Sequence, residues 1–394
     1  ATYTPLVNFT GDGTISVASN TFTDLAGNGN TAGSLATPIA IDTAAPATPT
    51  LALDPGISNP VSRAEALQTS GVVTVAGEAG SAITVIFTRN GSSVTKNLIG
   101  TGSPQAVVLT NGVNGDLARL GDGLVIVTAS QTDAAGNPQT AAPATTSFTL
   151  DTASAVVSTV TSPVTDGTVV AFQQLLQIRI VYNEDVTIDT TGGSPTLSLS
   201  TALGGQAIYI RQLDARTLIF RYTPQLGDAV STLDVASPSA LVLNGAVIRD
   251  TAGNAATSML PIGSLAGKRI AVDAALQATA QAVGSTPENA PSRTNSRRTL
   301  TITFNAPVSG MSLSSFKLYY AAPPRRATDP LAFRLVTLKG ATVTGSGTTY
   351  TLTMPANLTS LRGSYRVDVG GPGSGVVSAG IPMTRPTSFF WKRV

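Results

Sequence analysis

Three short segments of the chain repeat one set of residues that could do chemistry: an Asp, followed closely by Ala-Gly-Asn. They are Asp24-Leu25-Ala26-Gly27-Asn28, Asp133-Ala134-Ala135-Gly136-Asn137 and Asp250-Thr251-Ala252-Gly253-Asn254. A carboxylate and an amide at this spacing can supply oxygen ligands to a metal ion. They can equally form a turn, in which the Asp caps backbone N–H groups and the Gly takes a positive φ. The residues alone leave both interpretations open.

The chain has 394 residues and contains neither His nor Cys. This excludes Ser-His-Asp triads, histidine and cysteine zinc sites, cysteine nucleophiles and iron–sulfur clusters. A glycosidase would need two acids roughly 5–10 Å apart beside a cleft. Glu184 and Asp185 are adjacent, so on a strand they point to opposite faces. Glu65 and Glu78 are isolated. We therefore predict a protein that is not an enzyme.

The composition indicates many short strands joined by many turns. Charged residues make up 12% of the chain, against about 25% in an ordinary domain, while Gly and Pro number 38 and 24. Apolar residues reach 42% and the net charge is only +2, which argues against disorder. We expect only short helical turns, around 61–67 and 312–315. Short β-branched runs predict strands at 71–77, 83–87, 124–129, 176–182, 196–199, 207–210, 217–222, 300–304, 315–320, 333–336, 349–353 and 365–369.

Each Asp-x-Ala-Gly-Asn segment is followed by an apolar strand that ends in another Asp: Asp42, Asp151 or Asp273. The two Asp residues are 18 residues apart in the first two copies and 23 apart in the third. The copies recur after 109 and 117 residues, which matches an immunoglobulin-like sandwich of about 100 residues. The predicted domains are therefore 1–42, 43–151, 152–273 and a basic C-terminal domain, 274–394, with a linker or long loop at 285–298.

Both ends of the chain raise a question of strand pairing. The segment 1–42 is too short for a seven-strand sandwich, so it is predicted to be a partial domain. Either the chain is cut from a longer one, which we favour, or another molecule completes this domain by donating strands. The tail 389–394 carries the only Trp. It packs within its own domain, which we favour, or pairs with the open edge of a neighbour.

The residues around the repeated turns carry a resemblance to known families. The segments 9–46 and 132–152, which contain the first two turns, resemble the bacterial Ig-like repeats of large surface adhesins of Gram-negative bacteria. The third domain resembles a repeat of very long cyanobacterial surface proteins linked to swimming. The matching segments are 182–186, 194–199, 220–228 and 248–254. The fourth is more weakly similar to Ig-like modules, through 304–310 and 313–316.

This resemblance implies an all-β fold of tandem Ig-like antiparallel sandwiches arranged as a rod. It implies a non-catalytic structural or adhesive protein, extracellular and at the cell surface, within a surface layer, filament or long adhesin. The absence of Cys fits an extracellular protein. Two alternatives stay open. One is a self-assembling filament subunit joined by strand complementation. The other is a carbohydrate-binding or spacer module of a secreted enzyme, for which Tyr182 and Tyr319-Tyr320 are the only indications.

In the adhesin members of this family, calcium lies near domain junctions and stiffens the rod. The resemblance therefore implies Ca2+ as a cofactor, bound at Asp24 with Asp42, at Asp133 with Asp151, and at Asp250 with Asp273. The neighbouring Asn residues would add side-chain carbonyl oxygens. The complete set of predicted metal ligands is Asp24, Asn28, Asp42, Asp133, Asn137, Asp151, Asp250, Asn254 and Asp273.

The charge is divided unevenly along the chain. Residues 1–273 carry a net charge of −8, and residues 274–394 carry +10. This asymmetry predicts head-to-tail self-association, contact with neighbouring surface proteins, or docking to an anionic polysaccharide or lipopolysaccharide through the C-terminal domain. No motif that reads nucleic acid accompanies the charge. No apolar run approaches the roughly 18 residues of a membrane span. The basic cluster that we single out is Arg297, Arg298, Arg325, Arg326, Lys392 and Arg393.

Overall fold

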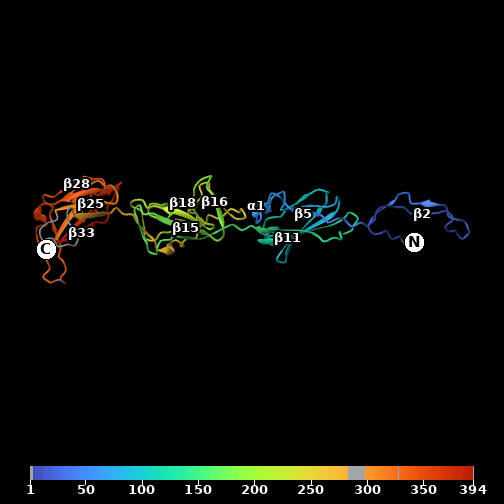
Figure 1. Cartoon of the computed structure of the whole chain (residues 1–394), viewed down its shortest axis with the longest axis horizontal. Helices are drawn as coiled ribbons and strands as arrows, with labels where there is room; N and C mark the ends of the chain where they lie inside the picture. The colour runs from blue at the N-terminus through green and yellow to red at the C-terminus, as the bar shows by residue number, and fades with distance from the viewer. Residues whose placement is uncertain (1–2, 283–297, 327, 394) are drawn as a thin grey trace. The chain divides into compact units, whose positions relative to one another are not determined.

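A computed structural model of the chain describes residues 3–282, 298–326 and 328–393 (Figure 1). Within them, strands form nearly all of the regular structure, so the predicted all-β class is confirmed. The helices are single turns. They are α1 (Arg63–Ala66), α2 (Asp116–Leu120) and the 3-10 turns η1 (Ala266–Lys268), η2 (Leu313–Ser315) and η3 (Ala356–Thr359). None of the helices in these residues has the length and hydrophobicity to cross a membrane.

The chain divides into two compact units. The first contains Ala1–Ala155, Asp185–Thr187 and Ile248–Thr257. The second contains Val156–Glu184, Ile188–Val247 and Ser258–Val394. The first unit thus takes in the third Asp-x-Ala-Gly-Asn segment, which comes about a hundred residues later in the sequence than the rest of it.

The centre of the first unit is a β-sandwich. Its three-stranded sheet has the order β10-β7-β5, and its five-stranded sheet has the order β6-β12-β11-β8-β9. Every second residue of β8 and β11 points into the core, because side chains alternate along a strand. Phe87 and Phe148 are fully buried there. The strands are β5 (Thr50–Leu53), β6 (Val61–Ser62), β7 (Val73–Ala76), β8 (Ala82–Arg89), β9 (Ser92–Ile99), β10 (Gln105–Val107), β11 (Gly123–Thr132) and β12 (Ala144–Asp151).

The segment 3–42 of the first unit has no core of its own. It consists of two short antiparallel pairs, β1 (Thr10–Gly13) with β4 (Ile39–Asp42) and β2 (Ser16–Val17) with β3 (Gly33–Ser34). None of its residues is buried. Phe22 is 63% exposed, a high value for an apolar residue on a strand-rich segment.

The second unit begins with a six-stranded sheet, β13-β15-β19-β18-β17-β21, and a three-stranded sheet, β14-β23-β20. The alternation in β15 buries Ile178 and Ile180 completely. The strands are β13 (Val157–Thr161), β14 (Val169–Ala171), β15 (Leu176–Tyr182), β17 (Thr196–Ser198), β18 (Gln206–Asp214), β19 (Thr217–Tyr222), β20 (Ala229–Val230), β21 (Leu241–Val242) and β23 (Ala271–Asp273). A separate two-stranded sheet pairs β16 (Val186–Asp189) with β22 (Val247–Asp250).

A second sandwich lies toward the C-terminus, with sheets β24-β25-β29-β28 and β27-β26-β30-β33 around one core. β33 pairs with β30 over its full length, and Trp391 stacks on Tyr365 at 5.2 Å between ring centroids. The prediction that the tail packs within its own domain is confirmed. The predicted linker lies outside the described residues from 285 to 297. The strands are β24 (Ala278–Ala282), β25 (Thr299–Phe304), β26 (Phe316–Ala321), β27 (Arg334–Val336), β28 (Thr342–Ser346), β29 (Thr349–Thr353), β30 (Gly363–Val369), β31 (Val377–Ser378), β32 (Ile381–Pro382) and β33 (Thr387–Arg393).

Candidate functional site

The three Asp-x-Ala-Gly-Asn segments fold into the same turn. In each, Oδ1 of the Asp accepts the backbone N–H of the Asn four residues later, at 2.8–3.0 Å. The Asn side chain donates in return to Oδ2 of the Asp, at 2.8–3.1 Å. The intervening glycines, Gly27, Gly136 and Gly253, have φ of 88°, 95° and 96°, where a side chain would be strained. The interpretation of these segments as turns is confirmed.

Hydrogen bonding within the turns also stabilises the ionised Asp. The side chain of Asn28 holds the pKa of Asp24 below its ordinary value, with help from backbone N–H groups. Asn137 lowers the pKa of Asp133 in the same way. The two hydrogen bonds between the Asp and the Asn of each turn fix the direction in which the Asn side chain points.

The Asn of the second and third turns makes a further contact, with the backbone where the preceding repeat ends. Nδ2 of Asn137 donates to the carbonyl oxygen of Asp42 at 3.1 Å. Nδ2 of Asn254 donates to the carbonyl oxygens of Asp151 and Ala153 at 2.9 and 3.1 Å. Two successive repeats therefore have the same joint, in which an Asn side chain holds a main-chain carbonyl of the strand-end Asp.

The joint at Asn254 is the more extensive of the two. Asn254 is only 8% exposed, and its Oδ1 accepts the backbone N–H of Arg63 at 2.9 Å. Arg63 is the first residue of α1, where backbone N–H groups have no partner within the helix. Asn254 thus connects its own turn, the strand end and the start of α1. By contrast, Asn28 is exposed, and within the described chain its side chain hydrogen-bonds only to Asp24.

The structure groups the strand-end Asp residues differently from the sequence-based expectation. That expectation paired the two Asp of one repeat, whereas the strand-end Asp meets the turn of the following repeat. Carboxylate oxygens of Asp151 and Asp250 lie within 4.8 Å of one another. Burial raises the pKa of Asp151, and the nearby charges of Asp250 and Asp122 raise it further.

Asp122 is a residue that the sequence analysis missed. Its carboxylate accepts the backbone N–H and the hydroxyl of Thr152, at 2.7 and 2.8 Å, directly after the strand end. A signal for it exists, because Gly121-Asp122-Gly123 matches Gly11-Asp12-Gly13 of the first repeat.

The remaining predicted metal ligands fit a cation unequally. The three Asn residues turn their side-chain nitrogen, and not their oxygen, toward the turn carboxylate. At Asn137 and Asn254 this orientation is required, because every group around Nδ2 is a hydrogen-bond acceptor. Asp42 accepts from the hydroxyl of Thr10 at 2.9 Å, and no contact joins it to Asp24 in the described residues. Asp151 and Asp250 do bring two carboxylates close together, an arrangement that suits a hard cation.

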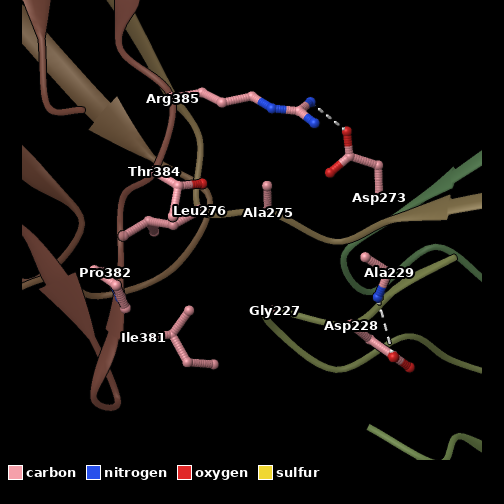
Figure 2. A pocket seen from close by; sticks show the side chains of 10 residues that line it. All are labelled: Gly227, Asp228, Ala229, Asp273, Ala275, Leu276, Ile381, Pro382, Thr384 and Arg385. Atoms are coloured by element: carbon pink, nitrogen blue, oxygen red, sulfur yellow. Dashed lines mark hydrogen bonds and ion pairs between the residues drawn. The ribbon is translucent and has the colours of Figure 1, made fainter. Parts of the chain in front are cut away.

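The third strand-end Asp has a different partner. Asp273 forms an ion pair with Arg385 at 2.9 Å, beside a cavity of about 210 Å³ in the second unit (Figure 2). Figure 2 shows the two side chains pointing toward each other, while Asp228 faces away and bonds to the N–H of Ala229. Asp228 is 1% exposed, and its carboxylate also accepts from the Tyr222 hydroxyl. Both acids that line the cavity therefore have partners within the protein.

The aromatic residues considered for carbohydrate binding separate into two classes. Tyr182 is 1% exposed, and burial raises its pKa to about 12, so it belongs to the core. Tyr320 packs against Tyr365 with its ring tilted by 48°, and it donates its hydroxyl to the carbonyl of Arg362 at 2.7 Å. Tyr319 instead lies on the outer face of its sheet, with the Arg366 guanidinium 4.1 Å from its ring centroid.

The predicted basic cluster is spread over several elements. Arg297 lies outside the described residues. Arg325 and Arg326 are exposed in the loop after β26, and Lys392 and Arg393 are on β33. Arg393 donates to the carbonyl of Thr359 at 2.8 Å.

Neither the models of known protein families nor the curated proteins match the sequence of this chain.

Proposed function

We propose that the chain is a non-catalytic, extracellular structural protein of a cell surface, in which Ig-like sandwiches follow one another as a rod. The observation that carries this proposal is the repeated joint, in which Asn137 and Asn254 each hold the main chain of the preceding repeat. A polar side chain that is used twice in the same way, at a spacing of one repeat, supports a connecting role. The chain contains no His and no Cys, so the catalytic chemistry that depends on those side chains does not compete with this proposal.

The mechanism of such a protein is mechanical. A hydrogen bond from a nearly buried Asn to a carbonyl restricts the bending of the segment between two sandwiches, since rotation would leave the carbonyl unsatisfied. The joint at Asn254 has four hydrogen bonds and the joint at Asn137 fewer, so we expect different stiffness at the two positions.

Small-angle X-ray scattering of the full chain tests this proposal. A stiff rod gives an extended particle with a sharply defined maximum dimension. In the double variant Asn137→Ala with Asn254→Ala, the joints loosen and the distance distribution broadens. A compact wild-type particle, or a variant that scatters identically to the wild type, would contradict the proposal.

A second candidate, a filament subunit joined by strand complementation, is favoured by residues 3–42. This segment exposes Ile15, Val17, Phe22 and Leu35 around a shallow groove and buries none of its residues. Strands from a second copy would cover these side chains. Electron microscopy and sedimentation of the full chain and of a chain lacking 1–42 test this candidate. Assembly that persists in the shortened chain would refute it.

Calcium belongs to the proposal at one position only, the close carboxylates of Asp151 and Asp250. Burial and the charge of Asp250 both raise the pKa of Asp151, and a bound cation would stabilise the two ionised carboxylates. Isothermal titration with CaCl2 tests this, comparing the wild type with Asp151→Asn. Asp151 is the better residue to change, because Asp250 also closes its turn. Equal heats of calcium binding in the wild type and in Asp151→Asn would exclude this site.

A further inference from the structure

Large apolar and aromatic side chains lie in a row on the outer face of the sheet β27-β26-β30-β33. Outward-facing positions of a strand are usually polar. Leu335 lies opposite Tyr319, Tyr319 opposite Arg366, and Arg366 opposite Phe390. Along β26, β30 and β33, the neighbours of these residues point into the core, so the row faces outward. Four strands at a spacing of about 4.8 Å give the row a length of about 14 Å.

The members of the row touch one another. The Arg366 guanidinium lies 4.1 Å from the Tyr319 ring centroid and 5.4 Å from that of Phe333. Phe333 in turn meets Phe390, with 6.2 Å between centroids and 67° between planes. Phe390 and Leu335 remain 53% and 66% exposed. We call these five residues the aromatic row. Apolar side chains that gather on both sides of one Arg in this way mark an interaction site more often than isolated exposed residues do.

The polar groups beside the aromatic row are also arranged on one face. Arg366 donates to Asp368 at 3.2 Å, and the Ser388 hydroxyl donates to the same carboxylate at 2.7 Å. Lys317 and Lys392 stand two residues from Tyr319 and from Phe390, which places them on the same face, and both are exposed. Across 298–326 and 328–393, 11 Lys and Arg oppose 2 acids. The surroundings of the row are therefore complementary to an anionic ligand.

We propose that the aromatic row binds an acidic polysaccharide. A sugar ring lies against the exposed side chain of Phe390, whose negative π-surface attracts C–H groups, and the polymer continues along the row past Arg366 and Tyr319. Carboxylate or sulfate groups of the polymer meet Lys317 and Lys392. This inference deepens the proposed surface role by naming the binding face and the class of ligand.

The acid at the centre of the face favours a sugar over a nucleic acid. The Asp368 carboxylate accepts hydrogen bonds, so it suits the hydroxyl groups of a sugar. The sugar–phosphate backbone of DNA has no free hydroxyl group to donate to this carboxylate, whereas the ring of a uronic acid does. Single-stranded DNA therefore serves as a competing ligand in the test.

Binding of the full chain to immobilised alginate, a polymer of uronic acids, tests the proposal, with neutral dextran as the reference polymer. Phe390→Thr removes the aromatic ring but places a residue of high strand propensity at this position, and it is expected to weaken alginate binding about tenfold. Leu203→Thr, at an exposed leucine outside this sheet, should leave affinity unchanged within about twofold. Circular dichroism melting of both variants shows that they are folded.

Charge variants give a second, independent measurement. Lys317→Gln with Lys392→Gln should reduce the salt dependence of alginate binding, whereas Lys339→Gln, which removes an exposed charge in the turn after β27, should not. Unchanged affinity in Phe390→Thr, or equal binding of dextran, would overturn the proposal. So would tighter binding of single-stranded DNA, or binding to anionic lipid vesicles alone. If the chain does not bind alginate but scatters as an extended particle, the proposed polysaccharide site is wrong and the proposed structural role stands.

Discussion

Replacing Asn254 by Ala should destabilise the joint that it forms, and by more than the same change at the other two turns. Asn254→Ala removes four hydrogen bonds, to Asp250, to the carbonyls of Asp151 and Ala153, and from the N–H of Arg63. Each hydrogen bond contributes about 0.5–1.5 kcal/mol net. We therefore expect a loss of about 3 kcal/mol. Asn28→Ala removes one side-chain bond at an exposed position, and we expect a loss of about 0.5–1 kcal/mol.

A chain of several sandwiches does not unfold in one step, so a local probe is needed. The amide of Arg63 is suitable, because its hydrogen-bond acceptor is the Asn254 side chain. In Asn254→Ala, hydrogen exchange at this amide should accelerate about a hundredfold, the factor that corresponds to about 3 kcal/mol. In Asn28→Ala and Asn137→Ala, the exchange rate at Arg63 should be unchanged. Equal exchange at Arg63 in Asn254→Ala and the wild type would refute the assignment of this joint.

The other predictions concern titration, repulsion and packing. Hydrogen bonds from Asn137 lower the pKa of Asp133, so this group stabilises the fold above its unfolded pKa and the contribution is lost as the pH falls through the folded pKa. Acid melting curves of the wild type should therefore fall more steeply below pH ~4 than those of Asp133→Asn, and parallel curves would count against the turn geometry. The pKa of Asp151 is raised, so its ionised form destabilises the fold, and Asp151→Asn should raise the melting temperature at pH 7 in chelator but not at pH ~3. An equal change in melting temperature at both pH values would mean that the charge of Asp151 is not the cause of the destabilisation. Gly227 has φ of 87°, and an added Cβ would lie 2.9 Å from Cδ1 of Ile381, so Gly227→Ala should cost about 1–3 kcal/mol in urea unfolding. An unchanged free energy of unfolding in Gly227→Ala would show that the Ile381 side chain moves to make room for the added methyl group.

The sequence predicted individual strands well where one face is buried. The ranges 176–182 and 349–353 coincide with β15 and β29, because apolar residues alternate there with polar ones, and the continuous apolar run within 217–222 coincides with β19, a strand buried over most of its length. The repeat itself was also visible, since its turn chemistry requires Asp, Gly and Asn at fixed positions.

The partners in the joints were not predictable in the same way. Asn137 and Asp42 are 95 residues apart, and Asn254 and Asp151 are 103 apart. The short spacing of 18 residues within a repeat suggested a local pair and concealed the distant one. The aromatic row was hidden for a related reason. It depends on the register between four strands, and an outward-facing row does not constrain register through burial.

The joint also has a consequence for how such a chain can change over time. Asn137 and Asn254 bind main-chain carbonyl oxygens, which every residue type possesses. The preceding repeat therefore needs no particular side chain to be held, only a strand that ends at the right place. A gene segment that encodes one repeat can be duplicated, deleted or exchanged, and each copy carries the Asn that forms the joint with the preceding repeat. Substitutions at the strand ends are then free of the compensating changes that side-chain interfaces demand.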